Sequence, residues 1–118
     1  MKSKPENNKP VCEVYADGYK SWWLNGKLHR EDGPAVETTY GDKYWYLNDK
    51  LHREDGPAAE YANGDKRWYL NDKLHREDGP AIELANGNKS WYLNGKPYTP
   101  SAHEIINYKM KYEIKTCL

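Results

Sequence analysis

The segment Leu51-His52-Arg53-Glu54-Asp55-Gly56-Pro57-Ala58 decides the fold, because the chain contains it three times. The other two copies begin at Leu28 and Leu74, so the period is 23 residues (51 − 28 = 74 − 51 = 23). A residue that recurs at every period is more simply explained by a backbone that needs it in each structural unit than by a single catalytic site. The segment therefore predicts a stack of repeated units.

Each copy follows an aromatic segment that has the pattern of a β-strand and a tight turn. In Lys43-Tyr44-Trp45-Tyr46-Leu47 the side chains alternate, so Trp45 and Leu47 share one face and the tyrosines take the other. The next residues are Asn48-Asp49 in this unit and Asn-Gly in the first and fourth units, and both pairs tolerate the positive φ of a hairpin turn. The pattern predicts one β-hairpin per unit.

A second strand is expected to begin at Leu51 and to be interrupted at residues 54–57. Gly56 can adopt the unusual φ of a bulge, and Pro57 has no backbone donor, so an uninterrupted ladder cannot pass this point. We expect a looped corner here, a resumed strand over residues 58–61, and a second turn that leads into the next Trp strand.

These units predict a mostly β fold, an elongated antiparallel meander of β-hairpin repeats that occupies residues 12–98. Units begin near residues 22, 45 and 68, and a partial unit begins at residue 91. Residues 1–11 are expected to form a disordered N-terminal arm. One buried face is expected to combine the Trp and Leu ladder with apolar residues of the resumed strand, which leaves its glutamates on the other face. The apolar residues are Val36, Ala59 and Ile82, and the glutamates are Glu37, Glu60 and Glu83.

Residues 99–118 are predicted to form a C-terminal helical cap. Ser101 and Glu104 have capping-box spacing, so we expect a helix from about residue 101 to residue 115. Because a repeat stack has an open end, we expect an apolar stripe of this helix to cover the aromatic face or the final hairpin. The stripe comprises Ile106, Met110 and Ile114, with Ile105 and Tyr112 alongside.

Composition excludes several classes of function. The chain has 118 residues with 18 basic and 18 acidic side chains, so no net positive charge favours nucleic acid as a partner. Its 5 Trp and 11 Tyr argue for a folded domain with a thin aromatic core. No stretch approaches the ~20 apolar residues of a membrane span, and the start has no signal-peptide pattern, so we expect a soluble, cytoplasmic protein. Cys12 and Cys117 are expected to be free thiols, with a disulfide between them as the alternative.

The repeats resemble the MORN family and its bacterial and viral variants. The matching features are the aromatic strand at residues 22–24, the turn Gly26-Lys27, His29 and the later turn residue Gly41, and the resemblance covers roughly residues 14–98. The Arg-Glu-Asp-Gly-Pro-Ala insert departs from the shorter family motif and is similar to repeats of phage and giant-virus proteins. The resemblance implies an elongated, twisted sheet of hairpins used for binding, with scaffolding, dimerisation or lipid contact as family roles, and it implies no reaction.

The repeated polar residues favour a structural role. Equivalent histidines two strands apart would be about 9 to 10 Å from each other, whereas the ligands of one zinc ion lie within ~2.1 Å of it. No Ser or Cys nucleophile recurs beside a histidine, and no Gly-rich loop leads from a strand into a helix. We therefore expect no enzyme, no metal and no cofactor, and we expect His, Arg and Asp to bond to each other and to the corner backbone. The structural positions are His29, His52, His75, Asp32, Asp55, Asp78, Gly33, Gly56, Gly79, Trp22, Trp45, Trp68 and Trp91.

The predicted binding surface consists of aromatic residues opposite the Trp ladder, rimmed by arginines. A single-layer sheet leaves one face open, and tyrosines among charged residues are typical of protein-recognition surfaces. The surface comprises Trp23, Tyr46, Tyr69, Tyr92, Arg30, Arg53 and Arg76. We expect a protein partner, and the viral resemblance implies an inhibitor of a host factor in the host cytoplasm.

Two alternatives stay open at this point. Aromatic rows also stack on carbohydrate or choline, and Trp-Tyr-Leu-Asn-Gly is similar to cell-wall-binding repeats. The open edges of the meander would in turn permit self-assembly into a homo-oligomer.

Overall fold

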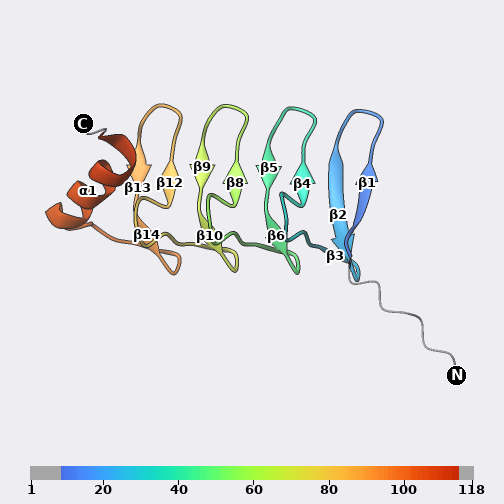
Figure 1. The fold of residues 1–118 in the computed structure, drawn as a ribbon, viewed down its shortest axis with the longest axis horizontal. Helices are drawn as coiled ribbons and strands as arrows, with labels where there is room; N and C mark the ends of the chain where they lie inside the picture. The colour runs from blue at the N-terminus through green and yellow to red at the C-terminus, as the bar shows by residue number, and fades with distance from the viewer. Residues whose placement is uncertain (1–8, 115–118) are drawn as a thin grey trace, which may run out of the picture.

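The computed structural model describes residues 9–114 as a row of hairpins that ends in a helix (Figure 1). The main sheet is antiparallel, with the strand order β1-β2-β4-β5-β8-β9-β12-β13, and β3 pairs with β2 beside this path. The molecule measures 62 × 33 × 32 Å. The predicted fold, an elongated antiparallel meander of hairpin repeats with a C-terminal helical cap, is confirmed.

Each complete unit contributes two hairpins rather than the one we expected, because the chain bends at its Trp. β5 ends at Tyr44 and β6 begins at Tyr46, so Trp45 lies at the bend. The main sheet contains β1 (Val11–Val14), β2 (Lys20–Leu24), β3 (Lys27–Leu28), β4 (Val36–Glu37), β5 (Lys43–Tyr44), β8 (Ala59–Glu60), β9 (Lys66–Arg67), β12 (Ile82–Glu83) and β13 (Lys89–Ser90). The small hairpins pair β6 (Tyr46–Leu47) with β7 (Lys50–Leu51), β10 (Tyr69–Leu70) with β11 (Lys73–Leu74), and β14 (Tyr92–Leu93) with β15 (Lys96–Pro97).

The tight turns form where the sequence predicts them. Asn48 and Asp49 have φ values of 50° and 66°, and Asn25 and Gly26 have values of 52° and 77°. Positive φ at both central residues is the geometry of a two-residue hairpin turn whose twist matches its strands. These turns place the small hairpins side by side along one long side of the molecule (Figure 1).

The register places the glutamates, not the apolar residues, on the Trp face. Lys20 pairs with Glu37, and Ser21 pairs with Val36. Trp22 is two residues from Lys20 in β2, so it shares a face with Lys20 and Glu37. The prediction that Val36, Ala59 and Ile82 join the Trp ladder is therefore wrong. The reason is that an arginine covers each of the first three Trp rings and makes that face compatible with carboxylates.

A ladder of alternating charge crosses the main sheet from β2 to β13. Successive cross-strand partners are Lys20, Glu37, Lys43, Glu60, Lys66, Glu83 and Lys89. Opposite charges that face each other across strands stabilise a sheet by roughly 0.2 to 1 kcal/mol per pair. Each unit contributes one lysine and one glutamate to this ladder, which helps to explain why the numbers of acidic and basic residues are equal.

The core is thin and made mostly of small side chains. Ala35, Ala58 and Ala81 are completely buried at the end of each corner, and Val36 and Ala59 follow them. The four ladder tryptophans are only half-buried, which corrects the expectation of an aromatic core. Trp45 and Trp68 line open grooves instead of filling an interior, and Trp91 packs against Tyr98 and Tyr108.

The C-terminal cap consists of α1 (Ala102–Tyr108) and a π-helical turn η1 (Lys109–Glu113). The Ser101 side chain accepts from the Glu104 backbone, and the Glu104 side chain accepts from the Ser101 backbone, so the predicted capping box is confirmed. The predicted end of the helix, residue 115, lies outside the described residues.

The helix turns tyrosines, not the predicted apolar stripe, toward the repeats. Ile106, Met110 and Ile114 are 54%, 59% and 54% exposed, whereas Tyr108 is 5% exposed. Tyr108 packs edge-on against Trp91, with 5.8 Å between ring centroids. The stripe prediction is wrong for Ile106, Met110 and Ile114, whereas Tyr112, which was also predicted in the stripe, does meet the third corner. The end of the stack offers both a ring and polar atoms, and tyrosine satisfies both.

The N-terminal end of the sheet is β1, which begins at Val11, one residue inside the predicted arm. Most of that arm lies outside the described residues, as does Cys117. Cys12 is a free, exposed cysteine.

Candidate functional site: the Trp-Arg corners and their grooves

Each corner begins and ends on the backbone of one tryptophan. In the second corner (residues 52–58), the His52 N–H donates to the Trp45 carbonyl at 3.0 Å. The Trp45 N–H donates to the Ala58 carbonyl at 2.8 Å. Trp22 closes the first corner (residues 29–35) and Trp68 the third (residues 75–81) through equivalent bonds. The Arg-Glu-Asp-Gly-Pro insert is therefore a closed loop mounted on the Trp bend.

An arginine ties each loop together and covers the indole. The Arg53 guanidinium carbon lies 4.0 Å from the Trp45 ring centroid, within the range of a cation–π contact. Arg53 Nε donates to Asp55 Oδ1 at 3.1 Å, and Nη1 donates to the Pro57 carbonyl at 3.0 Å. Nη1 also lies 3.6 Å from Glu60 Oε1. The predicted bonding of Arg and Asp to each other and to the corner backbone is thus confirmed.

The corner glycine provides space rather than an unusual backbone. The glycines with positive φ are Gly18, Gly26, Gly41, Gly64, Gly87 and Gly95, so Gly56 does not use the unusual φ of a bulge or tight bend, although the predicted looped corner forms. A Cβ atom at Gly56 would lie 2.8 Å from the Arg53 guanidinium carbon. Glycine is required because the folded-back arginine passes directly over it.

The corner histidines connect neighbouring units. The Asn71 N–H donates to His52 Nδ1 at 3.0 Å, and His29 and His75 accept from the next unit in the same way. Because Nδ1 accepts, the proton of the neutral ring lies on Nε2, which is 3.7 Å from Glu54 Oε1. The structural role proposed for these histidines agrees with this geometry. Across residues 9–114, no group of three or more His, Cys, Asp or Glu side chains could hold a metal ion.

Sequence reasoning missed a second set of links between units, made by turn aspartates. Asp72 Oδ1 accepts from the Leu51 N–H at 2.6 Å, and Asp65 Oδ1 accepts from the Ala85 N–H at 2.7 Å. Asp49 and Asp42 make the equivalent bonds one unit earlier. A partial signal was present: the first hairpin turn, which has no preceding unit, carries Gly26 where the next two turns carry aspartate, and the last outer turn carries Asn88. The fourth hairpin turn departs from this pattern, because it carries Gly95 although a unit precedes it.

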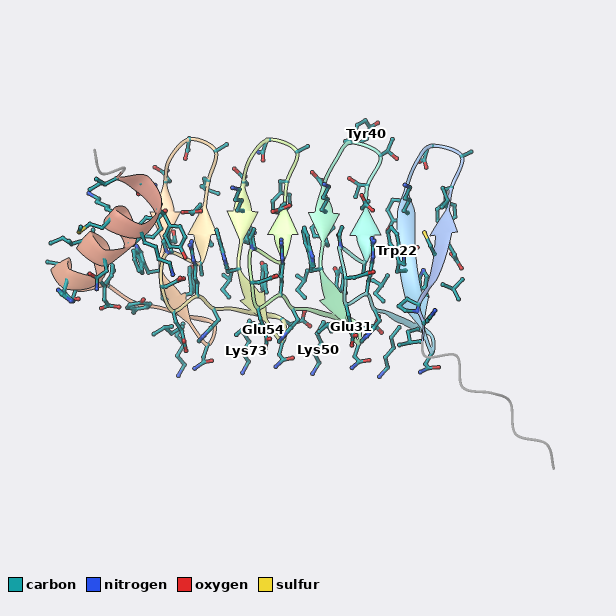
Figure 2. All side chains as sticks on the ribbon, viewed as in Figure 1. Trp22, Glu31, Tyr40, Lys50, Glu54 and Lys73 are labelled. Atoms are coloured by element: carbon teal, nitrogen blue, oxygen red, sulfur yellow. The ribbon has the colours of Figure 1, made fainter. Side chains whose placement is uncertain are left out.

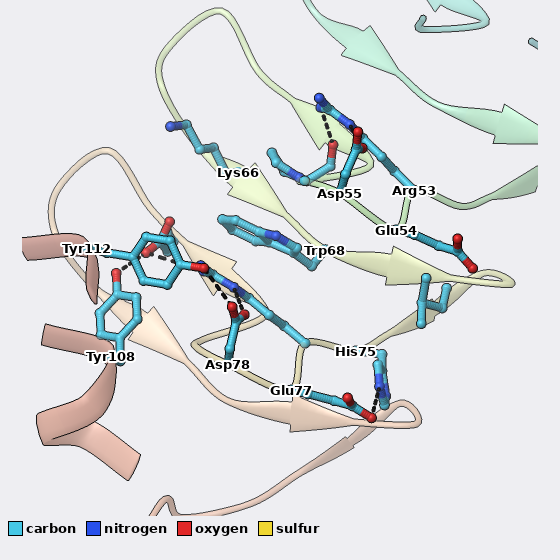
Figure 3. Close-up of a pocket in the computed structure, with 15 residues that line it drawn as sticks. Arg53, Glu54, Asp55, Lys66, Trp68, His75, Glu77, Asp78, Tyr108 and Tyr112 are labelled. Atoms are coloured by element: carbon cyan, nitrogen blue, oxygen red, sulfur yellow. Dashed lines mark hydrogen bonds and ion pairs between the residues drawn. The ribbon is translucent and has the colours of Figure 1, made fainter. Parts of the chain in front are cut away.

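Two open grooves lie between successive corners. The first groove, between the first and second corners, has a volume of about 760 Å³ and is lined by Trp45 and Leu47. The second groove, between the second and third corners, has a volume of about 840 Å³ and is lined by Trp68 and Leu70 and, on the side of the third corner, by Tyr108 and Tyr112 of the cap (Figure 3). Arginines and carboxylates of the flanking corners line the same grooves. This combination suits a ligand with both flat and charged groups.

One long edge of the molecule carries alternating charges, and two of them, Glu31 and Glu54, also line the grooves. Figure 2 shows Glu31, Lys50, Glu54 and Lys73 along one long edge of the molecule. The Glu31 and Glu54 side chains are 82% and 83% exposed. Tyr40 lies at the opposite edge, far from both grooves (Figure 2).

The third corner differs from the others because the C-terminal cap covers it. Tyr112 Oη donates to Asp78 Oδ2 at 2.6 Å, and Lys111 Nζ lies 3.1 Å from the same oxygen. Burial alone would raise the pKa of Asp78, but the hydrogen bonds from Tyr112 and Lys111, together with Arg76, outweigh it and lower the pKa to about 2. Burial and a hydrogen bond to Glu83 raise the pKa of Tyr108.

The structure divides the predicted binding surface between two faces. Arg30, Arg53 and Arg76 lie on the Trp face, at the corners. The aromatic members, Trp23, Tyr46, Tyr69 and Tyr92, pair with Leu28, Leu51, Leu74 and Pro97, the first pair across β2 and β3 and the others in the small hairpins, and all four are half-buried. Burial raises the pKa of Tyr46. The tyrosine row is thus less open than we expected, and the grooves lie on the other side of the sheet.

Comparison with known proteins adds no family. No protein-family model matches the chain, and no curated protein matches it. Within residues 9–114, no helix is long and apolar enough to cross a membrane.

Proposed function

We propose that this protein is a non-enzymatic repeat module that binds another protein through the corner side of its elongated sheet. The observation that carries this proposal is the pair of grooves, which repeat one unit apart on one face. Each combines an aromatic ring, a guanidinium and exposed carboxylates, and aromatic residues and arginine dominate the energetics of protein interfaces. A repeated site along a row suits an extended macromolecule better than a single small substrate.

The links between units support a rigid surface of this kind. Histidine bonds join the four Asn-containing hairpin turns in sequence on one long side, and Asp42 and Asp65 join the last three turns on the opposite side, so the grooves keep a constant spacing. A preorganised surface binds with a smaller loss of conformational entropy. The resemblance to viral repeats makes a host protein the partner that we expect.

The carbohydrate or choline alternative has less support. A sugar or quaternary ammonium group stacks on an open aromatic face, and Arg30, Arg53 and Arg76 already cover one face of Trp22, Trp45 and Trp68. Self-assembly has one favourable observation, which is that β1 is an exposed edge strand with Val11 and Val14 at 55% and 62% exposure. Sedimentation velocity of the purified chain distinguishes that alternative.

The experiment is affinity capture of partners by the tagged protein from bacterial lysate, with a high-salt wash and quantitative mass spectrometry. The corner variant is Glu31→Lys with Glu54→Lys, which reverses two exposed rim charges, and the control is Tyr40→Ser at the opposite edge. A variant of the tyrosine face, Tyr46→Ser with Tyr69→Ser, tests the other side, and circular dichroism confirms that each variant is folded.

We expect one stoichiometric protein to be retained by the wild type and the Tyr40 control and lost by the corner variant. If only the tyrosine variant fails to retain the partner, the binding surface lies on the tyrosine face instead of at the corners. Recovery of no protein other than the bait would contradict the proposed function.

A further inference from the structure

We propose that the first two corners bind a tyrosine- and lysine-bearing segment of a partner protein, in the way that the third corner holds the chain's own C-terminal cap. The inference rests on the proposed function and names the chemistry of the partner. It follows from comparing three corners that have the same sequence, of which only the third is covered by another segment within residues 9–114.

The covered corner shows what chemistry this site accepts. The Tyr112 ring lies 4.9 Å from the Arg76 guanidinium carbon, and the Tyr108 ring lies 5.5 Å from it. Tyr108 Oη donates to Glu83, and Asp78 Oδ2 accepts from both Tyr112 and Lys111. Aromatic rings therefore face the guanidinium while hydroxyl and ammonium groups meet the carboxylates.

The same acceptor atoms are already in place at the two open corners. Asp32 and Asp55 hold the Nε of their arginines through Oδ1, at 2.9 and 3.1 Å, as Asp78 does at 3.2 Å. Glu37 and Glu60 lie 3.7 and 3.6 Å from the Nη1 of the arginines, and Glu83 lies at 3.7 Å. The corner geometry therefore does not depend on the helix, so a ligand meets a preformed site.

The exposed fractions of the corner arginines and aspartates show how much surface the cap covers. The arginine side chains of the open corners, Arg30 and Arg53, are 22% and 23% exposed, whereas Arg76 is 7% exposed. The aspartates change from 88% exposed at both open corners to 50% at Asp78. The open corners thus retain apolar and charged surface that the chain covers in the one place where no further corner follows.

The side chains, not the helix backbone, are what a partner would reproduce. The next corner flanks each open site, so a ligand must insert side chains into the grooves of about 760 and 840 Å³. An aromatic ring over Arg30 or Arg53 and a lysine at Asp32 or Asp55 fit this space. A basic, tyrosine-containing segment is the occupant, and the negative charge exposed at the corner tips complements it.

The test uses a synthetic peptide with the sequence of residues 101–114, added to the full chain. Binding is measured by isothermal titration calorimetry and by Trp fluorescence. The control peptides replace Tyr108 and Tyr112 by Ala, or Lys111 by Glu. The protein variant is Asp32→Asn with Asp55→Asn, which keeps an Oδ1 acceptor for the arginines and removes the charge.

We expect the peptide to bind the wild type and to bind the double variant about tenfold more weakly. This is the effect of losing one hydrogen bond to a charged group. Both control peptides should bind more weakly by a similar factor. A Tyr108→Ala, Tyr112→Ala protein uncovers the third corner, so it should bind one additional peptide.

Peptide binding that the Asn substitutions leave unchanged, or no binding, would overturn the inference. If the protein captures a partner from lysate and the Asp32→Asn, Asp55→Asn variant captures the same amount, the inference would also be overturned. The proposed function would remain intact in that case. Self-association that disappears in the Tyr108→Ala, Tyr112→Ala protein would identify a second copy as the occupant and would overturn the assignment to a foreign partner.

Discussion

At the scale of single residues, the arginine of each corner explains why its neighbours recur. Arg53 covers Trp45, holds Asp55 and the Pro57 carbonyl, and passes over Gly56. Removing any one partner leaves a half-buried cation or its acceptors without a bond, which is costly. The identical copies are therefore a consequence of one compact set of contacts.

The first prediction concerns Gly56→Ala. The new Cβ would lie 2.8 Å from the Arg53 guanidinium carbon, so the arginine must leave the Trp45 ring. We expect the free energy of unfolding in urea to fall by about 1 to 3 kcal/mol, as for overpacked sites.

A double-mutant cycle with Arg53→Ala provides the control for this prediction. When the arginine is absent, the added methyl group has room, and the cost of Gly56→Ala should shrink. Equal costs in both backgrounds would show that the glycine is needed for some reason other than this contact.

The second prediction concerns pH and Asp78. Its pKa in the folded protein, about 2, is lower than the ordinary value of 3.8, so the charged carboxylate stabilises the capped state. This contribution is present above about pH 4 and is lost as the pH falls through 2. We expect the cap to undock over that window, measured by Tyr and Trp fluorescence.

The matched control is Asp78→Asn against Asp55→Asn, because both residues bond to an arginine and only Asp78 meets the helix. The fluorescence change between pH 4 and 2 should be reduced in the first variant and kept in the second. An unchanged transition in Asp78→Asn would assign the acid response to other carboxylates.

At the scale of elements, the hairpin turns were predictable because their signals are local. The Asn-Asp and Asn-Gly turns need only two residues with positive φ, and the capping box needs only Ser101 and Glu104. The face that the helix buries was not predictable, because Ile106, Met110 and Ile114 have helical spacing but no partner surface of matching shape. The helix turns its tyrosines toward the repeats because their rings and hydroxyl groups contact the third corner, which is distant in the sequence.

The third prediction tests the aspartate link between hairpins. Gly95 has a φ of 79°, close to the 66° of Asp49 and Asp72, and its N–H already donates to the Leu74 carbonyl. An aspartate at position 95 can accept from the Leu74 N–H, as Asp72 does from Leu51. We expect Gly95→Asp to stabilise the protein by about 1 kcal/mol in thermal and urea unfolding.

Gly26→Asp is the control, because it has the same turn position and a φ of 77° but no preceding unit. It should give no gain. A similar effect of both substitutions would mean that the turn conformation, not the bond between units, controls stability here.

At the scale of the whole molecule, stability should be a sum over units and their interfaces. Each unit bonds to the next through histidine and aspartate, and only the terminal units differ. The free energy of unfolding should therefore depend on the number of stacked units, and the stack can be lengthened by adding units.

The fourth prediction is that a second copy of residues 51–73, inserted after Lys73, extends the stack without changing its ends. Two added strands should lengthen the particle by about 10 Å in small-angle X-ray scattering. The urea m-value should rise with the additional buried surface. A separate unfolding transition for the inserted unit would contradict the additive stack.

The sequence by itself determined the 23-residue period, the tight turns, the interrupted corners and the presence of a helical cap, because turn chemistry and alternation act over a few neighbouring residues. Only the tertiary structure decided that the glutamates share the Trp face, that the grooves open there, and that tyrosines dock on the third corner. Those features depend on contacts between distant residues, such as His52 with Asn71 and Tyr112 with Asp78, separated by 19 and 34 positions. Spacing along a strand cannot reveal such contacts, because they are fixed by how the units stack.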